Sequence, residues 1–231
     1  MSRGVLAGVR TRAGGAVVIA IDGPGGVGKS TVARAVAAEL GLEHLDTGAT
    51  YRAATLAALR AGADTSDEEA VVDAISRARI GYEHGVIFLD GDPVPGAVRS
   101  AEVTAAVSAV SAIADVRDLI VEIQRQWVRR RGGSAVVEGR DIGTVVFPDA
   151  AVKVFLTART DVRAARRATD VEAAGRNVAD IAAELAERDR HDSTREVSPL
   201  VPAEGATVID TSDLQIEEVV AKVMTLVSDR A

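Results

Sequence analysis

The segment Gly23–Ser30, GPGGVGKS, has the residue types and spacing of a loop that binds nucleotide phosphates. Its glycines let the backbone curl so that several N–H groups point at phosphate oxygens. Lys29 supplies a mobile positive charge for the β- and γ-phosphates, and the Ser30 hydroxyl can ligate Mg²⁺. The pattern predicts a site for a nucleoside triphosphate with Mg²⁺, but the same loop serves kinases, GTPases and motor ATPases.

The rest of the sequence favours a kinase. A GTPase would need a guanine-reading N-K-x-D segment, and the sequence has none. A motor or assembly ATPase usually carries an acid directly after an apolar strand. The nearest candidates are Glu138 and Asp210, and neither is a full match.

Arginines near the predicted strand ends and in the polar late helices suit a kinase with two phosphorylated substrates, because the guanidinium fork matches phosphate oxygens. These are Arg52, Arg140, Arg166, Arg188 and Arg195. The run Arg129–Arg131 ends a predicted helix and is expected only to complement the helix dipole. No general base is evident. A phosphate acceptor, with a second pKa of about 6, needs none, whereas a hydroxyl acceptor would need a carboxylate.

The elements that position these residues follow from apolar patterning. Buried strands are predicted at 16–21, 42–45, 134–137, 152–156 and 207–209. Helices are predicted at 30–40, 49–61, 66–78, 101–131 (in one or two pieces), 161–174, 178–190 and 215–229. Residues 80–99 read as a β insertion with a turn at Asp90–Pro93. The alternation predicts an α/β fold with a parallel sheet and its ligand at the carboxyl ends of the strands.

Composition excludes other classes. The net charge is −7 and aromatic residues are 3% of the chain, which argues against binding a nucleic-acid polymer. Cysteine is absent, and His44, His84 and His191 are too far apart for a histidine metal site. No apolar run has the length of a membrane span. We expect residues 1–15 to form a disordered basic tail, not a secretory signal, and the protein to be cytoplasmic.

Five segments together resemble the bacterial cytidylate kinases, a family of P-loop nucleoside-monophosphate kinases. They are Ile19–Thr31 (IAIDGPGGVGKST), Leu45–Arg52 (LDTGATYR), Gly139–Asp149 (GRDIGTVVFPD), Glu187–Asp192 with Arg195, and Pro199–Pro202 (PLVP). The third segment is more specific than the phosphate loop. The resemblance covers nearly all of the chain from Val17 onward.

The resemblance implies a P-loop three-layer sandwich with a parallel sheet of about five strands flanked by helices. A single nucleoside-monophosphate kinase domain would span 16–231, with a small β-containing monophosphate-binding insert at about 64–111 and a short helical lid at about 169–178. The implied reaction, in pyrimidine nucleotide metabolism, transfers the γ-phosphoryl of Mg-ATP to CMP or dCMP. The implied partners are these nucleotides alone, and the implied state is a monomer.

The resemblance also implies roles for individual residues. ATP would be bound by Gly23, Pro24, Gly25, Gly26, Val27, Gly28, Lys29, Ser30 and Thr31, with Ser30 on the metal. The acceptor phosphate would be held by Tyr51, Arg52, Arg140 and Arg188. Cytosine would be read by Thr47, Ser108, Arg117 and Asp141, and the ribose would meet Asp192 and Arg188. Arg166 and Arg195 would face the transferring phosphoryl, completing a catalytic set with Lys29, Arg140 and Arg188. His191 stands where the family commonly has a further arginine.

Cytosine reading has a physical logic, because Asp141 could accept from the exocyclic amine that uracil lacks. Two other interpretations stay open at this stage. A kinase for UMP or a small hydroxylated metabolite would show no strong CMP preference and would tolerate Asp141→Asn. A regulatory nucleotide-binding protein would show no acceptor-dependent turnover and would carry a large exposed apolar patch.

Overall fold

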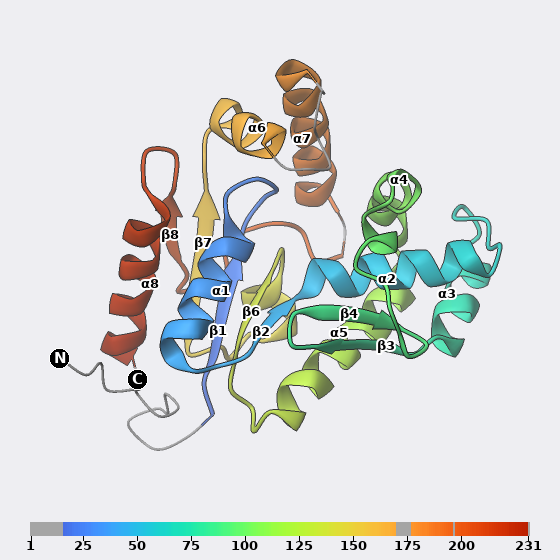
Figure 1. The fold of residues 1–231 in the computed structure, drawn as a ribbon, viewed down its shortest axis with the longest axis horizontal. Coiled ribbons are helices and arrows are strands. Elements are labelled where there is room, and N and C mark those ends of the chain that lie inside the picture. Colours follow the sequence, from blue (N-terminus) through green and yellow to red (C-terminus); the bar gives the residue numbers. More distant parts are fainter. Residues whose placement is uncertain (1–15, 170–176, 196, 231) are drawn as a thin grey trace.

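A five-stranded parallel sheet lies at the centre of a computed structural model, which describes residues 16–169, 177–195 and 197–230 (Figure 1). The strands are β1 (Val18–Asp22), β2 (His44–Asp46), β6 (Ala135–Gly139), β7 (Val152–Thr157) and β8 (Thr207–Asp210), in the order β2-β6-β1-β7-β8. Every neighbouring pair is parallel. The predicted strands are therefore confirmed. The expected tail at 1–15 and most of the expected lid lie outside the described residues.

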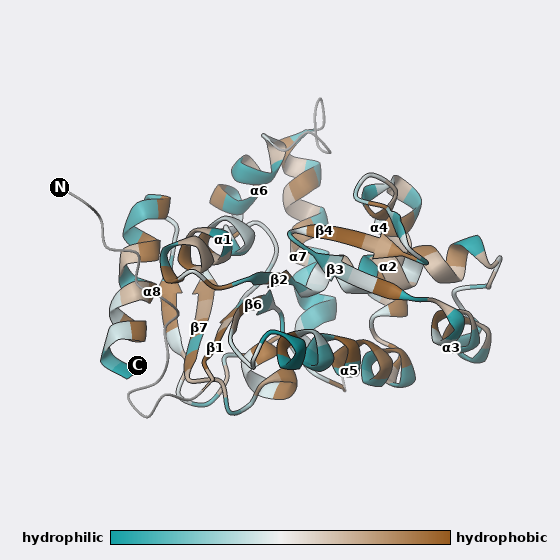
Figure 2. Cartoon of the chain, turned by 60° about the horizontal axis from the view of Figure 1, so that its bottom comes forward, coloured by the Kyte–Doolittle hydropathy of each residue, from teal (hydrophilic) through white to brown (hydrophobic). Residues whose placement is uncertain are grey.

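Helices cover both faces of this sheet and make three layers, as predicted (Figure 1). α1 (Lys29–Leu40) and α8 (Ile216–Arg230) pack on one face, and α2 (Thr47–Arg60) and α5 (Ala114–Arg130) on the other. Ile19, Ile21 and Ala20 of β1 have no exposed surface because β1 lies between both layers. Figure 2 shows this arrangement as hydrophobic colour on the central strands and mixed colour on α5 and α8.

The helix period in the sequence placed α1 correctly. Val32, Ala33, Val36, Ala37 and Leu40 are buried against the sheet. Gly41 ends the helix in the left-handed region, with φ 65°, as a C-terminal stop is expected to do.

A smaller antiparallel sheet forms the predicted insertion. It contains β3 (Ile80–Glu83), β4 (Val86–Leu89) and β5 (Asp92–Pro93). α3 (Glu68–Arg77) and α4 (Ala101–Val110) lie beside it (Figure 1). The predicted turn is shorter than expected, because Asp92–Pro93 pairs with β4 and only Asp90–Gly91 turns. A second turn at His84–Gly85, with positive φ at both residues, was not predicted.

The late helices stand beyond the carboxyl end of β7 (Figure 1). α6 (Thr160–Ala168) and α7 (Val178–Ser193) pack on each other through Ala164, Ile181 and Leu185. The predicted helix at 101–131 is two helices, α4 and α5, separated at Ser111–Ile113. No helix among the described residues is long and apolar enough to cross a membrane.

Arg131 was expected only to complement the helix dipole, but in the structure it also makes specific contacts. Its guanidinium lies 3.7 Å from the centre of the Trp127 ring and forms ion pairs with Glu43 and Glu83. The Trp127 indole donates a hydrogen bond to the Tyr82 carbonyl. These contacts tie the end of α5 to the small sheet, so the insertion is anchored to the core at this point.

We expect Gly139→Ala to destabilise the fold. A Cβ at Gly139 would lie 2.6 Å from both Thr47 Oγ1 and Ile142 Cδ1, and Thr47 and Ile142 are buried. Overpacking of this kind costs about 1–3 kcal/mol, which chemical denaturation would measure. Gly96→Ala is the matched control, because a Cβ there meets nothing within 4 Å. Equal stability of the two variants would contradict this packing analysis.

Candidate active site

The phosphate loop connects β1 to α1, as predicted. Gly23 has φ 145°, and a Cβ there would lie 2.2 Å from the Leu156 carbonyl oxygen, so only glycine fits. Lys29 follows at the start of α1 and donates to the Pro24 carbonyl at 2.7 Å. Burial, and then the nearby Arg140, lower the pKa of Lys29 to about 7. The positive charge of Lys29 is thus only partly neutralised by the groups around it.

Glu138 lies at the carboxyl end of β6 and joins three elements. Its side chain accepts from Ser30 Oγ at 2.9 Å and lies 2.9 Å from His44 Nε2. Its backbone carbonyl accepts from Thr47 Oγ1 at 2.6 Å. The sequence identified Glu138 only as an incomplete match to an ATPase acid and gave His44 no role. Their contact depends on the register of β2 against β6, which the sequence does not state.

Asp22, at the end of β1, holds the segment that follows β6. Its two oxygens accept from the Ile142 and Gly143 N–H groups at 2.8 Å each. Burial raises the pKa of Asp22 to about 6, although both hydrogen bonds lower it. Arg140 and Asp141 directly precede this anchored turn, so Asp22 sets where they lie. Sequence reasoning gave no role to Asp22.

Two arginines donate to one buried carboxylate on α7, Asp192, and the charge of a third, Arg188, acts on it from nearby. Arg140 donates to Asp192 Oδ2 at 3.0 Å, and Arg195 donates to Asp192 Oδ1. Burial would raise the pKa of Asp192, but the surrounding arginines hold it below its ordinary value. Burial, and then Arg140, lower the pKa of Arg188 to about 10. Positive charge therefore exceeds negative charge at this wall of the site.

Arg117 and Asp141 form a buried ion pair on the insertion side. Arg117 also donates to Ser198 Oγ at 3.1 Å and to the Ser111 carbonyl at 3.2 Å. Its guanidinium lies 5.4 Å from the centre of the Tyr51 ring. The Tyr51 hydroxyl is buried without a hydrogen-bond partner among the described residues, and burial raises its pKa. An unpaired buried hydroxyl is the kind of group that a bound ligand would satisfy.

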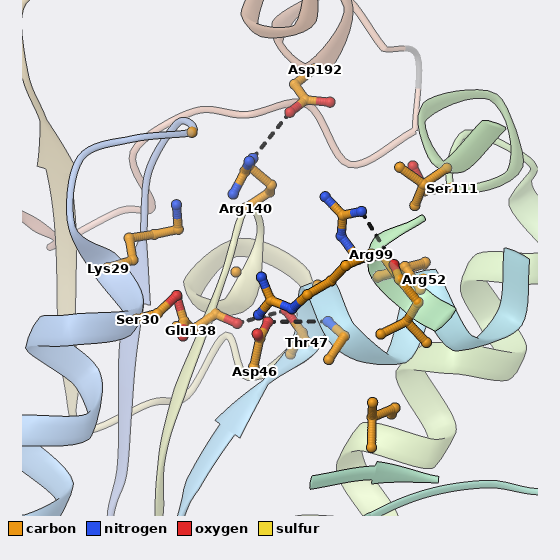
Figure 3. A pocket seen from close by; sticks show the side chains of 18 of the residues that line it. Lys29, Ser30, Asp46, Thr47, Arg52, Arg99, Ser111, Glu138, Arg140 and Asp192 are labelled. Atoms are coloured by element: carbon orange, nitrogen blue, oxygen red, sulfur yellow. Dashed lines mark hydrogen bonds and ion pairs between the residues drawn. The ribbon is translucent and has the colours of Figure 1, made fainter. Parts of the chain in front are cut away.

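One cavity brings most of the predicted residues together. Figure 3 shows Lys29 and Arg140 pointing into the same space, with Arg52 on the opposite side. Predicted residues that line the cavity are Gly25, Gly26, Lys29, Ser30, Thr47, Tyr51, Arg52, Arg117, Arg140, Asp141, Arg188, Asp192 and Arg195. Asp46, Arg99, Glu138 and Arg167 also line it, and none of these had been assigned to the site.

Several predicted residues are placed elsewhere. Arg166 donates to Thr211 Oγ1 at 3.0 Å and to its carbonyl at 2.7 Å, and the neighbouring Arg167 lines the cavity. Ser108 lies on α4, and Ser111 reaches the cavity in its place. Gly23, Pro24, Val27, Gly28 and Thr31 belong to the loop and the first turn of α1, behind the cavity lining. His191 is exposed on α7.

Comparisons with a family model and with curated proteins all find similarity to cytidylate kinases. The family model described as cytidylate kinase matches residues 19–229. A curated cytidylate kinase of Mycobacterium leprae (strain Br4923) is 50% identical over 218 residues, covering 93% of this chain and 97% of that one. A cytidylate kinase of Desulfitobacterium hafniense (strain Y51) is 44% identical, covering 92% and 93%. A solved structure of an uncharacterized protein from Eubacterium ventriosum ATCC 27560 shares the fold, with TM-score 0.52, 12% identity, and 93% and 99% coverage.

The Asp22 environment predicts a pH-dependent difference in stability. Because burial raises the pKa of Asp22 from 3.8 to about 6, the folded state binds this proton more tightly than the unfolded state. The stability that protonation gives is complete below pH ~4 and is lost as the pH rises through about 6. Relative to Asp22→Asn, the parent should lose about 3 kcal/mol across this window. Denaturant unfolding of both proteins from pH 4 to pH 7 measures this difference, and parallel curves would contradict it.

Proposed function

Because this chain belongs to the cytidylate kinase family, we propose that it transfers the γ-phosphoryl group of ATP to the phosphate of CMP or dCMP. The observation that carries this proposal is the cavity itself, where a phosphate loop faces arginines that share too few carboxylates. Two bound phosphate groups would supply the missing negative charge. An acceptor phosphate is already ionised at neutral pH, so this site needs no general base.

On the donor side, Lys29 would exchange its bond to the Pro24 carbonyl for bonds to the β- and γ-phosphates of ATP. The phosphate charge would favour the protonated amine and restore the pKa that burial lowers in this structure. Backbone N–H groups of the loop from Gly23 to Gly28 would hold the remaining oxygens.

The residues present fit Mg²⁺ as the companion of ATP. Among the described residues, no group of three or more His, Asp or Glu side chains is arranged to hold a metal alone. Mg²⁺ commonly uses one or two protein groups together with phosphates and water. Ser30 would hold the ion, with the Glu138 carboxylate 2.9 Å from the Ser30 hydroxyl. When bound, Mg²⁺ would neutralise charge that develops on the β- and γ-oxygens.

On the acceptor side, Arg52, Arg140 and Arg188 would hold the phosphate of CMP. The buried Tyr51 hydroxyl, which has no hydrogen-bond partner among the described residues, would donate to one of its oxygens. Arg195 would add charge where the phosphoryl group transfers. Arg166 can take the same role only if its side chain leaves Thr211.

We further propose that the lid and insertion close over both nucleotides and exclude water. Rapid ATP hydrolysis without CMP would contradict that closure.

Cytosine would be read by the Arg117–Asp141 pair together with Thr47, and by Ser108 if closure brings α4 nearer. One Asp141 oxygen accepts from Arg117, and the other would accept the exocyclic amine of cytosine. Uracil presents a carbonyl at that position, so its oxygen and the Asp141 oxygen, both acceptors, would face each other.

The ribose would meet Asp192, whose oxygens both accept from arginines already. Loss of the 2′-hydroxyl in dCMP would therefore leave no carboxylate oxygen unpaired.

Steady-state ADP formation from Mg-ATP with CMP, dCMP, UMP, AMP and GMP tests this function. We expect fast turnover with CMP and dCMP, and a lower kcat/KM for UMP. Asp141→Asn should reduce the CMP-to-UMP preference about tenfold, since an unpaired buried polar group costs about 1–3 kcal/mol. Asp149→Asn, an exposed position in the same segment, is the control. Slow turnover that is the same with every acceptor would overturn the proposal.

Because Arg188 lies close to Arg140, its replacement should affect the stability of the ligand-free protein and the binding of CMP differently. Arg188→Met removes a half-buried cation that lies beside Arg140, so the ligand-free variant should melt no lower than the parent. The rise in melting temperature caused by saturating CMP should disappear, because the variant lacks a phosphate contact. That rise corresponds to about 2.7 kcal/mol at 100 times Kd.

Arg190→Gln is the matched control, because Arg190 is exposed on the same helix and pairs with Glu187. It should keep the full CMP-dependent shift. An Arg188→Met protein that also keeps the full shift would contradict the phosphate-binding role of Arg188.

A further inference from the structure

His44 is a partly buried histidine beside the donor site, and the proposed transfer does not use it. It begins β2, and its Nε2 lies 2.9 Å from Glu138 Oε1. The side chains of His44 and Glu138 are only 10% and 3% exposed. Because an ionised carboxylate only accepts hydrogen bonds, Nε2 must carry the hydrogen and donate it.

Strand register creates this contact. In the parallel pairing of β2 with β6, His44 lies opposite Val136 and Asp46 lies opposite Glu138. Residues two apart on a strand share a face, so His44 and Glu138 are diagonal neighbours on one face of the sheet. The Thr47 hydroxyl fixes the Glu138 backbone from the start of α2.

The two oxygens of Glu138 have different donors. Oε1 accepts from His44, and Oε2 accepts from Ser30 Oγ at 2.9 Å. The carboxylate is thus held from β2 on one side and from α1 on the other. If the His44 bond were lost, Glu138 could rotate and the Ser30 hydroxyl would lose its fixed acceptor.

The direction of the Ser30 hydroxyl matters for a cation. A hydroxyl has one hydrogen and two lone pairs, so a hydrogen directed at Glu138 leaves the lone pairs available to a metal ion. We propose that His44 is a positioning residue that, through Glu138, orients the Ser30 oxygen toward the Mg²⁺ that accompanies the nucleotide. This inference rests on the proposed function, since it requires a metal–nucleotide complex in the loop.

A purely structural role for His44 makes a different prediction. If the bond only joined β2 to β6, its loss would lower stability and weaken nucleotide binding equally with and without metal. Positioning of Ser30 acts only on the metal-dependent part of the affinity. Residues that orient metal ligands typically change metal affinity about 10–100-fold when they are replaced.

The test compares His44→Asn with His44→Gln. The Gln amide can reach the position of Nε2 and donate to Glu138, whereas the Asn amide is one methylene too short. Calorimetry would give the Kd of a non-hydrolysable ATP analogue with Mg²⁺ and with EDTA, in the absence of acceptor. We expect His44→Asn to weaken binding about tenfold with Mg²⁺ and less than about twofold with EDTA. His44→Gln should restore the Mg²⁺ value to within about threefold.

His84→Asn, at an exposed turn, is the control for loss of a histidine and should match the parent. Thermal unfolding would first confirm that each variant folds, and His44→Phe replaces His44→Asn if the latter does not. Equal weakening with and without Mg²⁺, or no weakening, would overturn the inference. Failure of the proposed function is a separate result, since it would appear as absent CMP-dependent ADP formation by the parent protein.

Discussion

Positive charge held largely out of water is the constraint on which this structure depends. Arg140, Arg188 and Arg195 surround the single carboxylate of Asp192, and Lys29 lies nearby in the phosphate loop. Moving such cations out of water costs several kcal/mol each unless counter-charges are present. The lowered pKa values of Lys29 and Arg188 express that cost. The cavity therefore carries positive charge that the nearby carboxylates do not neutralise, and bound phosphate groups would neutralise it.

The sheet makes this arrangement possible because it fixes where each charge lies. Parallel pairing brings the ends of β1, β2 and β6 to one edge. At that edge Asp22 anchors the turn that follows Arg140, and Glu138 contacts the start of α1. The hydrophobic layers on both faces supply the stability that the charged edge lacks. Lys29 therefore follows the loop after β1, and Arg140 and Asp141 come directly after β6, whereas Arg188 and Arg195 come from the late helix α7 and the segment that follows it.

Much of this could be predicted from sequence where the signal was local. The apolar runs gave the strands, the period of Val32, Val36 and Leu40 gave α1, and the GPGGVGKS segment gave the phosphate loop. Contacts that depend on strand register or on the direction of a side chain could not be predicted from the sequence. The contact of His44 with Glu138 follows from strand pairing. Arg166 and Arg167 are adjacent, and only the path of α6 decides that Arg167 lines the cavity.

The most direct test of the account is the affinity of the protein for CMP compared with cytidine, measured by calorimetry without ATP. The two ligands share base and ribose and differ only in the phosphate that Arg52, Arg140, Arg188 and Tyr51 are proposed to hold. Charge-assisted hydrogen bonds contribute about 1.5–3 kcal/mol each, so CMP should bind at least about 100-fold more tightly. Equal affinities would show that these side chains do not bind the phosphate of CMP, and would contradict the account.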